Sequence, residues 1–99
     1  MSYLITHIIN SLENANKNKS KIDEDILDMN GMSGKKTRHF YNNLCSMEDA
    51  RYLEIGVWKG STLCSAMCNN ENLICLGIDN WSEFGGPKNV FNCYFNKNK

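Results

Sequence analysis

Apolar side chains recur with the helical period near the start of the chain, which predicts an amphipathic helix over residues 2–13. These side chains are Leu4, Ile5, Ile8, Ile9 and Leu12. The polar tract over residues 14–20 shows no such period, so it predicts a linker.

Two further helices are predicted before residue 48. The first covers residues 22–29, with Ser20 and Asp23 placed as a capping pair. One face of this helix carries Ile22, Ile26 and Met29. After a glycine-containing turn over residues 30–34, the next helix covers residues 35–47, and its predicted buried side chains are Phe40, Leu44 and Met47.

The pattern then changes to strand, turn, helix and strand. Residues 51–55 predict a strand, and the glycine turn of residues 56–60 follows it. A helix begins at Ser61, with Leu63, Ala66 and Met67 on its apolar face. Residues 73–78 predict a second strand, parallel to the first, and we expect Pro87 to begin another helix.

This layout is typical of a nucleotide site. In open α/β sheets, ligands bind beyond the carboxyl ends of the strands, where a glycine turn lets the backbone approach and a later acidic side chain binds the ribose. Gly56, Gly60 and Asp79 occupy those positions here. The alternatives are a tight turn that holds no ligand and an Asp79 that caps a turn.

The same residues carry a family resemblance. The run Glu54–Thr62, with Gly56 and Gly60, and the run Gly77–Trp81 resemble the first two motifs of class I S-adenosylmethionine-dependent methyltransferases. The subgroup most similar is the macrocin O-methyltransferase-like enzymes that act on small molecules. Trp58 stands where the wider family usually has its middle glycine, as it does in that subgroup.

The resemblance implies the fold class. It implies an α/β, Rossmann-like methyltransferase fold that is truncated to two parallel strands with flanking helices. Residues 1–47 would then be an N-terminal helical segment, and residues 48–99 the first half of a domain that binds S-adenosyl-L-methionine. Gene truncation, an early stop or assembly with another chain would each explain a half domain.

The resemblance also assigns roles to individual residues. Asp79 would accept both ribose hydroxyls, and Glu54 would hold the methionine end of the cofactor, unless it is a buried structural carboxylate bonded to nearby N–H groups. The other residues implied to bind the cofactor are Gly56, Gly60, Ser61, Asn80 and Trp81. Asn80 and Trp81 would lie along the adenine, although Trp81 is equally consistent with simple core packing. The turn at residues 31–34 would serve as a lid over the cofactor or as an ordinary turn.

Three functions compete. The leading hypothesis is a methyltransferase, or a fragment of one, that acts on a small molecule or glycan and transfers the methyl group to oxygen. The second is a catalytically inert remnant or regulatory subunit that pairs with a complementary chain or with itself. A nicotinamide-dependent oxidoreductase is disfavoured, because Trp58 and Ser61 break the Gly-x-Gly-x-x-Gly pattern. No catalytic or metal-binding residue is assigned, and His39 is interpreted as a surface or capped histidine.

Charge balance, the length of apolar runs and cysteine spacing limit the partners, location and metal sites expected for the chain. Eleven basic and eleven acidic side chains balance, which argues against nucleic acid and anionic membranes as partners. No apolar run approaches the roughly 20 residues that span a bilayer, and the start lacks a signal-peptide pattern, so we expect a cytoplasmic protein. The 5 cysteines form no Cys-x-x-Cys pair, which predicts reduced, mostly buried thiols and no zinc site.

Overall fold

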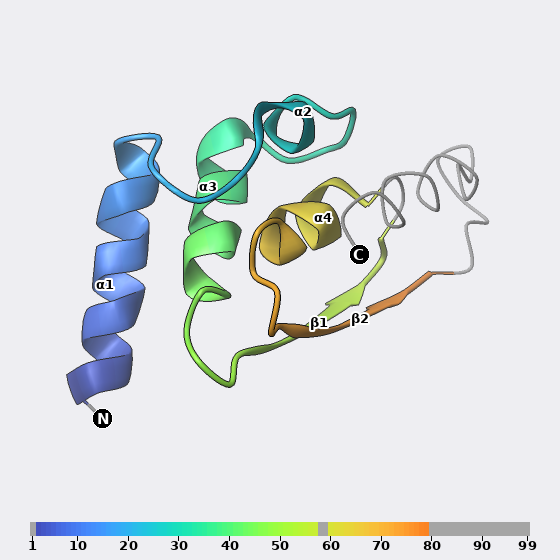
Figure 1. The fold of residues 1–99 in the computed structure, drawn as a ribbon. Coiled ribbons are helices and arrows are strands. Elements are labelled where there is room, and N and C mark those ends of the chain that lie inside the picture. Colours follow the sequence, from blue (N-terminus) through green and yellow to red (C-terminus); the bar gives the residue numbers. More distant parts are fainter. Residues whose placement is uncertain (1, 58–59, 80–99) are drawn as a thin grey trace.

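The computed structural model describes residues 2–57 and 60–79 (Figure 1). Within these residues the chain forms a small mixed α/β fold. Its elements, in order, are α1 (Ser2–Asn16), α2 (Glu24–Leu27), α3 (Lys35–Leu44), β1 (Arg51–Ile55), α4 (Ser61–Met67) and β2 (Ile74–Ile78). The helix predicted from Pro87 lies outside the described residues.

The two predicted strands are confirmed. β1 and β2 are adjacent and parallel, and their register pairs Arg51 with Ile74 and Ile55 with Ile78. Since α4 lies between them in the sequence, the three elements form a β-α-β unit. The carboxyl ends of both strands therefore lie together at one end of the sheet.

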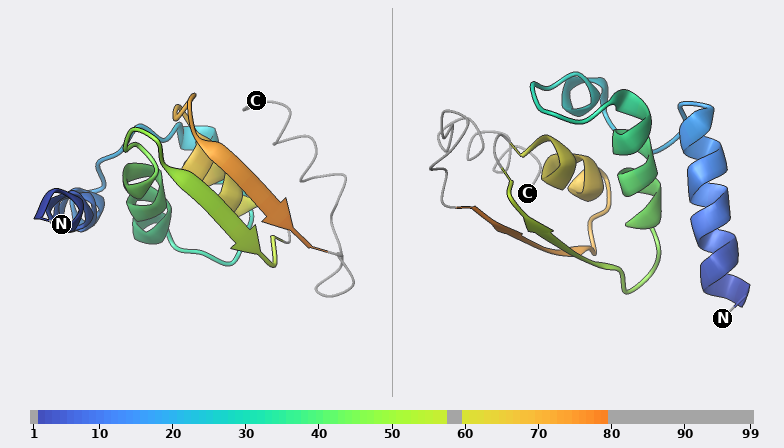
Figure 2. Two further views of the ribbon diagram at one scale, coloured as in Figure 1. Left: turned by 90° about the horizontal axis from the view of Figure 1, so that it is seen from below. Right: turned by 180° about the vertical axis from the view of Figure 1, so that it is seen from behind.

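The described helices lie on one side of this sheet (Figure 2). Side chains alternate along each strand, so every second residue faces α4 and the others face away. The outward face is apolar and exposed: its hydrophobic side chains are Leu53, Ile55, Ile74, Leu76 and Ile78. The sheet thus has one face covered by helix and one apolar face open to solvent.

The best-buried apolar cluster joins α2 to α4 rather than to the sheet. Ile26 and Met29 pack against Cys64 and Cys68, and Ile22 lies at the edge of the cluster. The predicted apolar face of residues 22, 26 and 29 is therefore confirmed. In α4, Leu63 and Ala66 are buried as predicted, whereas Met67 is half-buried.

The second helix is shorter than predicted, and its predicted cap does not form. Asp23 is at the N-cap position, but its side chain makes no capping hydrogen bond. Ser20 instead accepts a hydrogen bond from the Ile22 N–H at 3.2 Å and lies 2.7 Å from His39 Nδ1. The serine hydroxyl therefore ties this turn to α3.

The predicted buried face of α3 is wrong. Phe40, Leu44 and Met47 are only half-buried, whereas the buried side chains of α3 are polar: Arg38, His39 and Asn42. The helix also ends at Leu44, three residues earlier than predicted. Hydrophobic periodicity failed here because polar side chains with specific hydrogen-bond partners occupy the interior face.

Asn42 shows why a polar side chain is buried. It is 0% exposed, and its Nδ2 donates to the carbonyl oxygens of Ser65 and Cys68 at 2.8 and 2.7 Å. Its Oδ1 accepts a hydrogen bond from the Lys21 N–H at 2.9 Å. One amide side chain thus joins α3, the end of α4 and the segment before α2.

The N-terminal helix is longer than predicted and turns its apolar face outward. α1 continues to Asn16, so the first residues of the predicted linker are helical. Ala15, at 1% exposure, is buried in this last turn. The side facing α3 holds polar and small residues, with His7 Nε2 lying 3.0 Å from the Leu44 carbonyl oxygen. The exposed hydrophobic side chains of α1 are Tyr3, Leu4, Ile5, Ile8, Ile9 and Leu12. Among the described helices, none has the length and apolar character needed to cross a membrane.

The described cysteines are free thiols, as predicted. Cys45, Cys64 and Cys68 are buried and Cys75 is half-buried. Burial raises the pKa of the Cys45 thiol to about 11 and that of Cys64 to about 12. These thiols therefore stay protonated and unreactive at neutral pH. Cys93 lies outside the described residues.

We predict that Asn42→Leu destabilises the protein by roughly 3 kcal/mol, because it leaves two buried carbonyl groups and one N–H without a partner. Urea denaturation followed by circular dichroism measures this change. The matched control is Asn10→Leu on the exposed side of α1, which should change the free energy of unfolding by less than about 0.5 kcal/mol. Equal stability of the two variants would contradict the role of Asn42.

Candidate functional site

The glycine turn after β1 adopts a backbone that only glycine accommodates readily. Gly56 and Gly60 have φ angles of +86° and +82°, which lie in the left-handed region. The Gly56 N–H donates to the Ile78 carbonyl oxygen at 2.8 Å, so the turn is fastened to the end of β2. Gly60 is the N-cap residue of α4. The chain thus leaves β1, turns at the carboxyl end of the sheet and enters α4.

A small pocket opens at this turn. Its volume is about 160 Å³, and its lining residues are Met32, Ser33, Gly56, Val57, Ser61 and Thr62. Met32 and Ser33 come from the turn predicted either as a lid or as an ordinary turn, and the structure places this turn at the pocket. No described atom lies within 4 Å of a Cβ built on Gly56, so the space beside this glycine is open.

Glu54 lies behind the pocket on the covered face of the sheet. Its Oε1 accepts hydrogen bonds from Tyr52 Oη and Thr62 Oγ1, both at 2.5 Å. Its Oε2 is buried and makes no hydrogen bond within the described structure. Burial and the bond to Glu54 raise the pKa of the Tyr52 phenol far above its ordinary value. The carboxylate is therefore held by hydroxyl groups, not by the N–H groups that the structural alternative expected.

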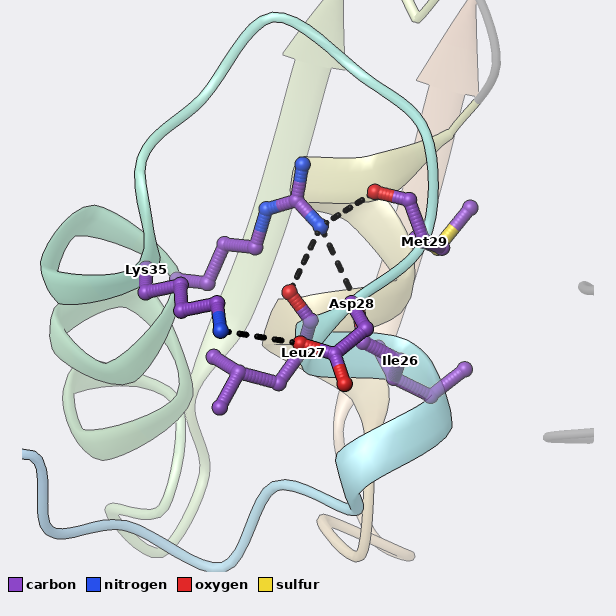
Figure 3. A network of polar contacts seen from close by, with 6 residues as sticks. Ile26, Leu27, Asp28, Met29 and Lys35 are labelled. Carbon is purple, nitrogen blue, oxygen red and sulfur yellow. Dashed lines mark hydrogen bonds and ion pairs between the residues drawn. The ribbon is translucent and has the colours of Figure 1, made fainter.

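Arg38 of α3 lies behind Ser33, one of the residues that line the pocket. It is 3% exposed, and its Nη1 donates to the carbonyl oxygens of Ile26, Leu27 and Met29 at 3.3, 3.0 and 2.6 Å. Figure 3 shows these carbonyl groups at the end of α2, together with the ion pair between Lys35 and Asp28. The guanidinium group thus binds the end of α2.

The serine hydroxyls connect this arginine to the pocket. Arg38 Nε donates to Ser33 Oγ at 3.0 Å, and Ser33 Oγ lies 3.4 Å from Ser61 Oγ. Ser61 is buried, and its carbonyl oxygen accepts from Ser65 Oγ. The pocket wall therefore holds two adjacent hydroxyls backed by a buried positive charge.

The structure brings several of the predicted site residues together. The turn contains Gly56 and Gly60, with Glu54 shortly before it and Ser61 directly after it. The half-buried Asp79 directly follows β2. Because Ile55 pairs with Ile78, Gly56 and Asp79 leave neighbouring strands at the same end of the sheet. Asn80 and Trp81 lie outside the described residues, as do Trp58 and Lys59.

His39 has no role at this pocket. The prediction was a surface or capped histidine; the ring is buried, so the surface alternative is wrong, and Ser20 is its hydrogen-bond partner. Burial lowers the pKa of the imidazole below its ordinary value, so the ring is neutral at pH 7. A neutral histidine fits a structural role between α3 and the turn before α2.

A larger cavity, of about 360 Å³, lies at the opposite end of the sheet and contains none of the predicted site residues. It is formed mainly by the two segments that enter the strands, with polar side chains such as Glu48, Asp49, Asn70 and Glu71 in its lining. Ligands of parallel sheets bind at the carboxyl end of the strands, so we assign no function to this cavity.

Ser33 and Arg38 are the site residues that sequence reasoning missed. Arg38 occurs in a helix rich in charged and polar residues, where a basic side chain is normally exposed. The only signal was the pair of glycines around Met32 and Ser33, which also fits an ordinary turn. Only the packing of the helices shows that Ser33 lines the pocket and that Arg38 donates a hydrogen bond to it.

The chain matches no protein-family model, no curated protein sequence and no solved structure. The site therefore has to be interpreted from its own geometry. Among the described residues, no group of three or more His, Cys, Asp or Glu side chains is placed to hold a metal ion.

We predict that Gly31→Ser disrupts this pocket, because a Cβ on Gly31 would lie 2.1 Å from Ser61 Oγ. The expected loss of stability is about 1–3 kcal/mol, as for other overpacked sites. Gly34→Ser is the matched control, since no atom lies within 4 Å of its Cβ and serine is favoured at the N-cap that Gly34 occupies in α3. Thermal unfolding of both variants checks the prediction, and a Gly31→Ser protein as stable as Gly34→Ser would refute the close contact.

Proposed function

We propose that the pocket at the carboxyl end of β1 and β2 binds S-adenosyl-L-methionine and that the protein serves methyl transfer to a small molecule or glycan, with oxygen as the acceptor atom. The fold in this proposal is the first part of a Rossmann-like methyltransferase domain. The observation that carries the proposal is the left-handed glycine turn beside Asp79 on a neighbouring parallel strand.

The open space at Gly56 fits a cofactor that lies close to the backbone. Any side chain at this position would project into space that the described residues leave open. The left-handed φ of Gly56 also makes a larger residue unfavourable there. Both observations agree with the role that the resemblance gives to this glycine.

The unpaired oxygen of Glu54 fits the amino group of the methionine part. A buried carboxylate oxygen without a hydrogen bond is costly, and a ligand ammonium group would satisfy it. Tyr52 and Thr62 orient the carboxylate by holding its other oxygen. Glu54 would therefore bind and position the cofactor without taking part in proton transfer.

Asp79 and the residues after it complete the assignment. The Asp79 carboxylate would accept hydrogen bonds from the two ribose hydroxyls, and the resemblance gives the adenine contact to Asn80 and Trp81. The bound cofactor supplies a methyl group on a sulfonium centre, and the protein acts mainly by alignment and by excluding water. The described residues contain two strands, so in this proposal the acceptor side of the site comes from polypeptide beyond them.

We predict that Asp79→Ala weakens the binding of S-adenosylhomocysteine by roughly 1.5–3 kcal/mol, because it removes a charged acceptor for two hydroxyl groups. Isothermal titration calorimetry measures the affinity. The control is Glu71→Ala, which removes an exposed carboxylate near the opposite end of β2 and should leave the affinity unchanged. Unchanged affinity in a folded Asp79→Ala protein would remove the ribose role and the main support for this cofactor.

The second candidate function is that of a catalytically inert subunit that pairs with another copy or with a complementary chain. Its support is the outward apolar face of the sheet, where Leu53 is 59% exposed and Ile55 is 77% exposed. Exposed apolar surface of this kind favours association, because pairing removes it from water. This candidate does not exclude the first, since a pairing chain would also extend the cofactor site.

We predict that the isolated chain self-associates through this sheet face. Light scattering should show assemblies larger than a monomer, and Leu53→Thr with Leu76→Thr should shift them toward monomer, since threonine keeps the preference for strand. The control pair is Thr37→Ala with Asn10→Ala at exposed polar positions. A compact monomer that melts cooperatively would contradict the pairing proposal.

A further inference from the structure

We infer that Ser33 and Ser61, backed by the Arg38 guanidinium, form a recognition site for the carboxylate group of an α-amino acid moiety. This inference rests on the proposed function and deepens it, because that function supplies such a group in the methionine part of the cofactor. The sequence suggested residues 31–34 as a lid or an ordinary turn but gave no role to the Ser33 hydroxyl or to Arg38, and these roles follow from the packing of α2, α3 and α4.

The Arg38 guanidinium places a positive charge in the interior. Arg38 is almost fully buried, yet its hydrogen-bond acceptors are neutral carbonyl and hydroxyl oxygens. The acidic side chain that acts on it electrostatically, Asp28, is 54% exposed and forms its ion pair with Lys35 at 3.1 Å. A buried cation without a buried anionic partner attracts an anion more strongly than a solvated one does.

The hydroxyl groups of Ser33 and Ser61 can donate hydrogen bonds to a ligand. Ser33 Oγ accepts a bond from Arg38 Nε, so its own proton remains available for another acceptor. Ser61 Oγ lies beside it, and both residues line the pocket. The two hydroxyls share one hydrogen bond in either direction, and the other proton of the pair is left for a carboxylate oxygen.

The Arg38 guanidinium has one further donor nitrogen, Nη2. Arg38 Nη2 makes no hydrogen bond within residues 2–57 and 60–79, whereas Nε and Nη1 are both engaged. A Cβ on Gly31 would lie 3.2 Å from this nitrogen and 2.1 Å from Ser61 Oγ. The glycine therefore keeps the arginine and Ser61 close together, with no side chain between them.

The charges near the pocket favour a ligand that carries both an anionic and a cationic group. Thr62 also lines the pocket, and its Oγ1 donates its proton to the Glu54 carboxylate. A buried cation behind Ser33 and a carboxylate behind Thr62 match the two charges of an α-amino acid zwitterion. A phosphate group would face Glu54 with like charge, so the pocket disfavours nucleoside phosphates.

The test compares two ligands that differ only at this end. S-adenosylhomocysteine carries the amino acid moiety, whereas 5′-methylthioadenosine has the same nucleoside and thioether without it. Titration calorimetry of the wild-type chain and of Ser33→Ala measures both affinities. We expect Ser33→Ala to weaken S-adenosylhomocysteine about tenfold or more, the usual effect of a lost hydrogen bond to a charged group, and to leave 5′-methylthioadenosine unchanged.

Two further variants make the test decisive. Arg38→Lys keeps a positive charge but loses the bond from Nε to Ser33, so it should give the same ligand-selective loss. Ser46→Ala, at an exposed position after α3, should change neither affinity. Because Arg38 also holds the end of α2, urea denaturation is measured for both Ser33→Ala and Arg38→Lys, and a selective loss counts only in a variant that stays folded.

The outcomes separate the two proposals. If wild-type chain binds both ligands equally well, or if Ser33→Ala weakens both to the same extent, carboxylate recognition is refuted while the nucleoside site stands. If the wild-type chain binds neither ligand, the proposed cofactor fails and the carboxylate site fails with it. A loss confined to S-adenosylhomocysteine supports both.

Discussion

The buried amide of Asn42 holds the helical layer together. Its three hydrogen bonds join α3 to α4 and to the segment before α2. Asn70 reinforces the contact, because its Nδ2 donates to the carbonyl oxygens of Asn42 and Ala66. Buried backbone groups need partners, and here side-chain amides supply them where the short α4 ends. The position of α4, and with it the glycine turn, depends on this contact.

A second polar anchor sets the position of α2. Arg38 binds three carbonyl oxygens where α2 ends, which fixes a helix of only four residues that could not persist alone. The same side chain bonds Ser33, so it also positions the turn that covers the pocket. Structure and candidate site therefore share one residue, and changing Arg38 would affect both.

The apolar surfaces show the opposite arrangement. α1 packs on α3 through its polar side, and its large apolar side chains remain exposed, as do those on the outer face of the sheet. Burying such side chains is worth roughly 1.5–3 kcal/mol each, so the chain leaves much of its available hydrophobic stabilisation unused. Association would recover that stabilisation, which is why pairing and cofactor binding belong together in the proposed function.

Local sequence patterns were sufficient for the β-α-β unit. The layout of strand, glycine turn, helix and strand located β1, β2 and the turn, because strand-forming residues and the need for a left-handed backbone at Gly56 and Gly60 are local properties. The apolar face of α2 was also predictable. For the site, Glu54 and Asp79 could be placed at the strand ends, but their partners could not be known.

Only the tertiary structure decided which faces of α1 and α3 are buried. In α3 the interior face is polar, so hydrophobic periodicity predicted the wrong buried side chains there, and in α1 the amphipathic pattern did not show that the apolar face points outward. The physical reason is that specific hydrogen bonds between residues far apart in the sequence, such as those of Arg38 and Asn42, outweigh local amphipathicity. The sequence by itself determined the strands and the glycine turn, whereas packing brought Ser33 to the pocket and Arg38 into contact with Ser33.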